Sequence, residues 1–186
     1  MFLEPFPSLN HGLLLDNFDA IEKDYLWAIE NQKFVDYQSM DEMLNNPKDT
    51  GHYWQAYPLI YNKKSWPGVN RSLDTLKLIK QLSIQPILAT FSVIAPFSNI
   101  KNHTDHDEHC IAGRTDTTVV KYHLGIRSND YCELVVNDEN KIVKNKEFLI
   151  FDESYEHFAF NNSDEVRGVL ILSFLRSDLA PSSESI

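Results

Sequence analysis

Residues 151–174 read Phe-Asp-Glu-Ser-Tyr-Glu-His-Phe-Ala-Phe-Asn-Asn-Ser-Asp-Glu-Val-Arg-Gly-Val-Leu-Ile-Leu-Ser-Phe. The stretch contains one histidine, His157, followed by a turn rich in Asn, Ser and Asp, and then Arg167 at the start of an apolar strand. An arginine at the mouth of such a strand is costly to bury unless an anion pairs with it. The stretch therefore predicts a strand that begins beside an anion.

A second polar segment lies upstream, at His103-Thr104-Asp105. Residues two apart on an extended segment point to the same side. His103, Asp105 and His157 can therefore present two imidazoles and one carboxylate to a single point. That combination is the facial ligand set of non-haem Fe(II) sites.

The residues after Asp105 leave an alternative open. His106, Asp107, Glu108 and His109 continue the polar run, and a solvated acidic loop of this kind also picks up stray metal. Spacing alone cannot choose the pair His103-x-Asp105 over His106-x-Glu108.

The segment 119–126 predicts a strand with two different faces. Thr117, Lys121, His123 and Gly125 share one face, whereas the other carries apolar side chains. A buried lysine and histidine need an anionic partner. That partner can be the protein's own Asp or Glu, or a bound anion supplied from outside.

Length and composition favour one globular domain spanning residues 1–186. The 186 residues are 42% apolar, carry a formal charge of −10 and include two cysteines, so no disulfide framework is expected. The negative charge argues against nucleic acid and anionic membranes as partners. No apolar run is long enough for a membrane span, and we expect a cytoplasmic protein.

The order of predicted elements indicates a mainly β fold with N-terminal helices. Helical spacing predicts a helix from about residue 17 to 31 and a second one capped by Ser72. Short strands are expected at 87–95, 119–126, 132–136, 148–151 and 168–174. We expect a helical N-terminal portion, 1–85, packed on a jelly-roll barrel, 86–176, with a disordered tail at 177–186.

The segment from Ser72 to Leu179 resembles the aspartyl/asparaginyl β-hydroxylase family of 2-oxoglutarate-dependent dioxygenases. The motifs that carry the resemblance follow the family's order and are Phe91-Ser92-Val93-Ile94-Ala95-Pro96, Ile100-Lys101-Asn102-His103, Lys121-Tyr122-His123-Leu124-Gly125, and Phe151-Asp152-Glu153-Ser154-Tyr155-Glu156-His157 with Asn161 and Arg167.

This resemblance implies a double-stranded β-helix and an Fe(II) site. His103 and His157 would be metal ligands, and Asp105 falls where some members have a third, carboxylate ligand. Ser92 and Arg167 would bind the distal carboxylate of 2-oxoglutarate, with Lys121 and His123 near its other end. The co-substrates would be 2-oxoglutarate and O2. The family's spacing between Ser92 and His103 favours His103 over His106 as the ligand.

The chain departs from the family pattern at two places that bear on the site. Lys121 stands where the family commonly has arginine, which keeps the charge and loses the planar fork. The linker between His103 and His123 is longer than usual, with the extra residues in 106–117. This loop is either a substrate lid or a neutral insertion.

The resemblance implies hydroxylation of an unactivated C–H bond in an amino acid, a peptidyl Asp or Asn, or a similar small metabolite. The alternative is a non-catalytic, cupin-like module for metal binding or sensing. Such a module would keep His103, Asp105 and His157. It would not need Ser92, Lys121 and Arg167 together.

Overall fold

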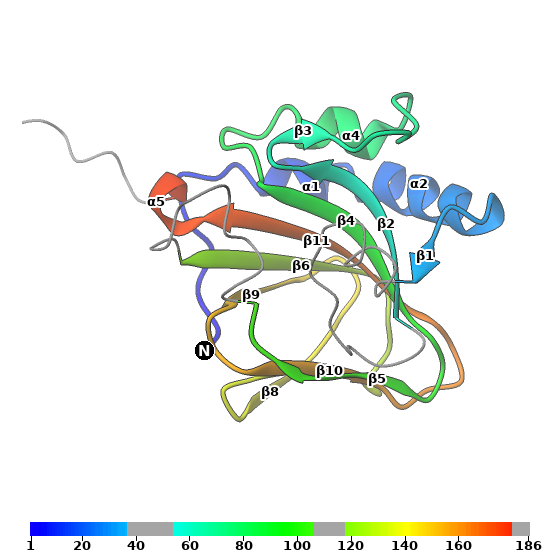
Figure 1. The fold of residues 1–186 in the computed structure, drawn as a ribbon, viewed down its shortest axis with the longest axis vertical. Coiled ribbons are helices and arrows are strands. Elements are labelled where there is room, and N and C mark those ends of the chain that lie inside the picture. Colours follow the sequence, from blue (N-terminus) through cyan, green and yellow to red (C-terminus); the bar gives the residue numbers. More distant parts are fainter. Residues whose placement is uncertain (37–53, 106–117, 180–186) are drawn as a thin grey trace, which may run out of the picture.

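The computed structural model describes residues 1–36, 54–105 and 118–179, and two antiparallel sheets form its body (Figure 1). The larger sheet has the strand order β1-β2-β4-β11-β6-β9, with β3 beside β2, and the smaller has the order β5-β10-β7-β8. The strands are β1 (Val35–Asp36), β2 (Trp54–Tyr61), β3 (Lys64–Ser65), β4 (Leu88–Ile94), β5 (Ser98–His103), β6 (Val119–Arg127), β7 (Cys132–Val136), β8 (Glu139–Ile142), β9 (Phe148–Asp152), β10 (His157–Asn161) and β11 (Arg167–Leu175).

The helices α1 (Gly12–Asp16), α2 (Phe18–Glu30) and α4 (Asp74–Ile79) lie on the outer face of the larger sheet (Figure 1). Helix α2 matches the predicted helix, and it buries Phe18, Ile21, Tyr25 and Ala28 along one face. A fourth, short helix, α5 (Arg176–Leu179), follows β11. None of the helices in the described ranges has the length and apolar character needed to span a bilayer.

The predicted cap of the second helix is wrong. Helix α4 is preceded by Leu73 and has no side-chain cap, because the amide and hydroxyl of Ser72 both bond to the Asn70 side-chain oxygen, at 3.0 and 2.7 Å. The core positions predicted for this helix are nevertheless buried, namely Leu73, Leu76, Ile79 and Leu82.

The predicted fold class is confirmed, with the five predicted strands present as β4, β6, β7, β9 and β11. The expected boundary at residue 85 does not separate helices from strands, because β2 pairs with β4 inside the larger sheet. Strands β5, β8 and β10 were not predicted. Residues 177–179 belong to α5 rather than to a tail, and 180–186 lie outside the described residues.

Each face of β6 packs against a different layer, as its alternation predicts. Val120, Tyr122, Leu124 and Ile126 join the core between the larger sheet and the helices. A second core lies between the two sheets and includes Leu134, Phe151 and Val169. The intervening residues of β6, Lys121 and His123, face this second layer and line a pocket there.

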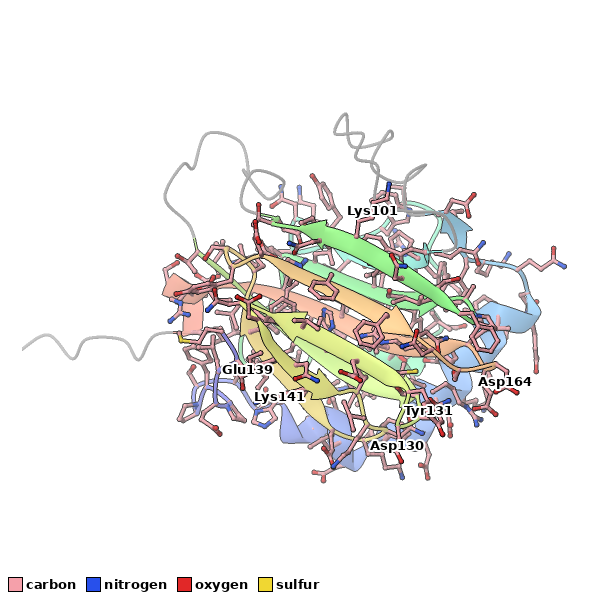
Figure 2. The ribbon with its side chains drawn as sticks, turned by 90° about the horizontal axis from the view of Figure 1, so that it is seen from below. Lys101, Asp130, Tyr131, Glu139, Lys141 and Asp164 are labelled. Atoms are coloured by element: carbon pink, nitrogen blue, oxygen red, sulfur yellow. The ribbon has the colours of Figure 1, made fainter. Side chains whose placement is uncertain are left out.

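The free edges of the sheets are protected in different ways. At the N-terminus, Phe2 bridges to Phe151, and the amide of Leu3 donates to the Ile150 carbonyl at 2.8 Å, so the first residues of the chain cover the edge strand β9. Figure 2 looks onto the outer side of the smaller sheet, where Lys101 on β5 and Glu139 and Lys141 on β8 lie. Charged side chains on such strands discourage pairing with another chain.

The glycine of the Lys-Tyr-His-Leu-Gly motif is required by a close backbone approach. Gly125 bridges to Asn145, in the turn before β9. A Cβ atom at Gly125 would lie 2.1 Å from the Lys144 carbonyl oxygen. Because that neighbour is backbone, it cannot move aside as a flexible side chain would.

Gly125→Ala should therefore destabilise the protein by about 1–3 kcal/mol, the usual cost of overpacking. For a domain of this size this corresponds to a loss of roughly 2–4 °C in melting temperature per kcal/mol. The matched control is Gly12→Ala, because a Cβ at Gly12 meets nothing within 4 Å. Equal melting temperatures of the two variants by calorimetry would contradict this assignment.

Candidate metal centre and adjoining pocket

The three predicted ligand residues converge on one point. His103 ends β5 and His157 begins β10, and the two residues pair directly across the antiparallel ladder. Their ring centroids are 4.4 Å apart. Asp105 follows β5, with its carboxylate oxygens 3.5 Å from His103 Nε2 and 3.3 Å from His157 Nε2. One ligand atom from each residue lies within 4.8 Å of the other two.

Backbone hydrogen bonds fix the orientation of both imidazoles. His103 Nδ1 lies 2.7 Å from the Lys101 carbonyl oxygen, and His157 Nδ1 lies 2.9 Å from that of Tyr155. A carbonyl only accepts, so each Nδ1 carries a proton, and in the neutral imidazole Nε2 is then the nitrogen with the lone pair. This arrangement is typical of histidine ligands, in which an outer partner sets the tautomer.

Burial and neighbouring charges shift the pKa values of His103 and Asp105. Burial, opposed by the charge of Asp105, lowers the pKa of His103 to about 4. Burial alone would raise the pKa of Asp105, but the charges of Lys121 and His157 outweigh it and hold that pKa well below its usual range. Two imidazole nitrogens, from His103 and His157, and one carboxylate, from Asp105, are a donor set that suits Fe(II).

Lys121 pairs with the protein's own carboxylates. Its ammonium bonds to Asp105 Oδ2 and lies 3.4 Å from Glu153 Oε2. Of the two partners considered for this lysine from the sequence, the structure contains the internal one. The position of Lys121 at the near end of 2-oxoglutarate stays a prediction.

Arg167 is the largest fully buried side chain of the described residues, and its charge has no visible counterpart. Its Nε and Nη2 atoms have no hydrogen-bond partner among the described residues. Burial lowers the pKa of Arg167 to about 10, so the guanidinium remains charged near neutral pH. Orphaned N–H groups on a buried guanidinium fit a carboxylate, which can accept two parallel hydrogen bonds.

Ser92 and His123 lie in the same pocket as Arg167. The Ser92 hydroxyl accepts a bond from Trp54 Nε1 at 2.8 Å, and a hydroxyl that accepts one bond can still donate its own hydrogen. Both ring nitrogens of His123 lack a partner among the described residues. Burial, followed by the charges of Arg167 and Lys121, lowers the pKa of His123 well below its usual value, so its imidazole is neutral.

The pocket connects the two groups of residues across the space between the sheets. The empty space of this pocket, including the open solvent at its mouth, amounts to about 350 Å³. His103 and His157 come from the smaller sheet, whereas Ser92, Lys121, His123 and Arg167 come from the larger one. The remaining lining is apolar and consists of Trp54, Ile100, Leu134, Phe158, Ala159 and Ile171.

Two further residues contact the predicted site residues. Trp54 donates its indole N–H to the Ser92 hydroxyl. Glu153 pairs with Lys121, but the run Asp152-Glu153 gives no signal as to which acid points inward. The alternative ligands His106 and Glu108, and the 106–117 loop as a lid, fall outside the described residues.

Comparison with known proteins finds the aspartyl/asparaginyl beta-hydroxylase family, whose model matches residues 15–177. Curated protein sequences give no significant match. Similar solved structures include the Cupin_2 domain of an XRE family transcriptional regulator from Enterobacter cloacae, at 15% identity and a TM-score of 0.42, covering 66% of this chain and 96% of that one. The plu4264 protein from Photorhabdus luminescens is 15% identical with a TM-score of 0.45, covering 70% and 82%. The Cnp3 cupin domain from Schizosaccharomyces pombe is 8% identical with a TM-score of 0.43, covering 69% of each chain.

Protein stripped with a chelator should bind one divalent ion, and His157→Ala should weaken Mn(II) affinity by more than about 100-fold. Loss of an outer partner already costs 10–100-fold, and loss of a ligand costs more. His11→Ala is the control, because His11 packs on Tyr122 and Phe148 away from the site and should leave affinity unchanged. Isothermal titration measures both, and equal affinities would remove His157 from the metal centre.

Proposed function

Because the chain belongs to the aspartyl/asparaginyl beta-hydroxylase family, we propose that it is an Fe(II)- and 2-oxoglutarate-dependent dioxygenase. Its reaction is hydroxylation of an unactivated C–H bond in an amino acid, a peptidyl Asp or Asn, or a similar small metabolite. One observation carries the proposal. Arg167, whose Nε and Nη2 atoms have no partner among the described residues, lines the same pocket as the two histidines of the candidate metal site.

His103, Asp105 and His157 would hold the iron as a facial set of two imidazoles and one carboxylate. Such a set leaves coordination positions open for other ligands. When bound, iron together with 2-oxoglutarate and O2 supplies the oxidising power for the hydroxylation, with release of succinate and CO2.

Arg167 and Ser92 bind the distal carboxylate of 2-oxoglutarate in this proposal. The guanidinium offers two orphaned donors, and the hydroxyl, held by Trp54 at 2.8 Å, adds a third. The neutral His123 imidazole can donate one further hydrogen bond to the co-substrate without adding charge. Together these residues neutralise and orient a dianion that would otherwise be costly to bury.

The apolar walls of the pocket limit the access of water to the reacting groups in this proposal. Ile100, Leu134 and Ile171 line the same pocket as His103, His157 and Arg167. A dry pocket strengthens the charge-assisted hydrogen bonds to the co-substrate and limits side reactions.

Succinate release is the direct test. The Fe(II)-loaded protein is incubated with 2-oxoglutarate and O2, with and without candidate amino acids and Asp- or Asn-containing peptides. We expect succinate to form and to increase when the substrate is present. A protein that binds metal and shows no affinity for 2-oxoglutarate would instead be a metal-binding module.

Arg167→Ala should weaken 2-oxoglutarate binding by about 30-fold or more. Truncating one partner of a buried charged pair costs roughly 2–5 kcal/mol, and each 1.4 kcal/mol is about tenfold. Ser92→Ala should cost less, since it removes one neutral donor, and Arg167→Lys should fall between wild type and alanine because it keeps the charge and loses the fork. Binding to the Mn(II)-loaded protein is measured by anaerobic calorimetry.

Arg176→Ala is the matched control for this series, because Arg176 pairs with Asp152 at 3.1 Å outside the pocket. It should leave 2-oxoglutarate affinity within about twofold, and metal affinity should be unchanged in all four variants. An Arg167→Ala protein with near-normal 2-oxoglutarate affinity would contradict the proposed anchor.

A further inference from the structure

Glu153 has no part in the function proposed above, yet it is 2% exposed and lies beside the metal residues. Its backbone joins two segments that come from distant parts of the chain. Its amide donates to the Val119 carbonyl at 3.2 Å, and its carbonyl accepts from the Asp105 amide at 3.4 Å. Glu153 therefore ties the segment that carries Asp105 to the start of β6.

The Glu153 side chain acts on the same segment through Lys121. The ammonium of Lys121 lies between two carboxylates, bonded to Asp105 and 3.4 Å from Glu153. Two carboxylates and one ammonium leave this trio with one net negative charge. Without the Glu153 carboxylate the net charge of the trio would be zero, so Glu153 strengthens its attraction for a divalent ion.

Removing that carboxylate would change what Lys121 does. With Glu153 present, the ammonium bonds to Asp105 and also lies within ion-pair distance of a second carboxylate. Without that second carboxylate, the ammonium would be drawn more strongly to Asp105 and would compete with a metal ion for the same carboxylate. A lysine close to a divalent ion is also repelled by it unless an anion offsets the charge.

We propose that Glu153 is a positioning residue of the metal centre. By holding Lys121, it keeps the Asp105 carboxylate anchored through one oxygen while lone pairs remain for the metal. The inference rests on the metal site of the proposed function. It goes further in giving Lys121 and Glu153 a role in metal binding that does not involve the co-substrate.

Asp152 provides a matched control at the adjacent position. It is 7% exposed and is also a carboxylate paired with a cation, since Oδ2 lies 3.1 Å from Arg176 Nη2. Its other oxygen accepts from the Ser154 amide and hydroxyl. Asp152 therefore resembles Glu153 in burial and charge pairing, but its side-chain partners among the described residues are Arg176 and Ser154 rather than the metal residues.

The test is a Co(II) titration of the full-length, chelator-stripped protein, without 2-oxoglutarate, followed by calorimetry and by the visible absorption of the bound ion. Glu153→Gln should weaken Co(II) affinity by about tenfold or more, the range found for outer partners of metal ligands, and should alter the absorption spectrum. The Co(II) affinity of Asp152→Asn should stay within about twofold of wild type, even if this variant lowers the melting temperature as much as Glu153→Gln does.

A double-mutant comparison separates positioning from a general effect on structure. In the Lys121→Gln background no ammonium competes for Asp105, so adding Glu153→Gln should lower Co(II) affinity by no more than about threefold. An equal loss in both backgrounds would overturn the proposal, as would an equal loss in Asp152→Asn or no loss in Glu153→Gln.

The Co(II) test and the succinate assay fail independently. Wild-type protein that forms no succinate, with Glu153→Gln still weakening Co(II) only when Lys121 is present, would refute the dioxygenase and leave the role of Glu153 intact. Succinate formation with unchanged Co(II) affinity in Glu153→Gln would do the reverse.

Discussion

The pairing of β5 with β10 is the interaction on which the site depends. It sets His103 opposite His157 in an antiparallel ladder, so two ligand nitrogens from distant parts of the sequence meet without any loop having to position them. Because side chains alternate along a strand, a slip of one residue would turn one imidazole to the opposite face. The register of the ladder shifts between His157 and Ala159, directly after this pair, so the shift does not separate the two histidines.

The larger sheet places basic side chains opposite the two histidines of the smaller sheet. It can do so because its outer face already packs into an apolar core. Helices α2 and α4 cover the outer side, where Tyr122 and Leu124 pack into an apolar core. This cover releases the inner side from the need to be wholly apolar, so Lys121, His123 and Arg167 can lie there. The cost of burying these side chains is met by internal carboxylates for Lys121, and it is unmet for Arg167 among the described residues.

Secondary structure and burial could be predicted from the sequence where they depend on a residue's neighbours along the chain. Strands β6 and β11 are apolar or alternate strictly, and their burial follows from that pattern. Strands β5 and β10 are read less easily, because Ser-Asn-Ile-Lys-Asn-His is polar and becomes a strand only through pairing with β10. The spacing of His103 and Asp105 made them candidate ligands, and the family resemblance favoured them over His106 and Glu108. The link from Asp105 through Lys121 to Glu153 depends instead on contacts between distant segments.

The helix cap predicted at Ser72 is wrong for a similar reason, because a side-chain contact decided it. Ser, with Asp74 in the first turn, is a favourable start for a helix, but Asn70 takes both polar groups of Ser72. Local propensity was correct about the helix and its buried face. Competition between two side chains for the same hydrogen bonds decided the cap.

The division of the site between two sheets has a consequence for molecular length. His103 and His157 come from the smaller sheet and Arg167 from the larger one, and facing sheets pack about 10 Å apart. Under the proposed function, a dicarboxylate must reach across this gap to touch both. Shorter diacids would fall short of one end, and longer ones would have to bend. Core side chains between the sheets, such as Leu134 and Ile171, would then select the co-substrate by its size without binding it.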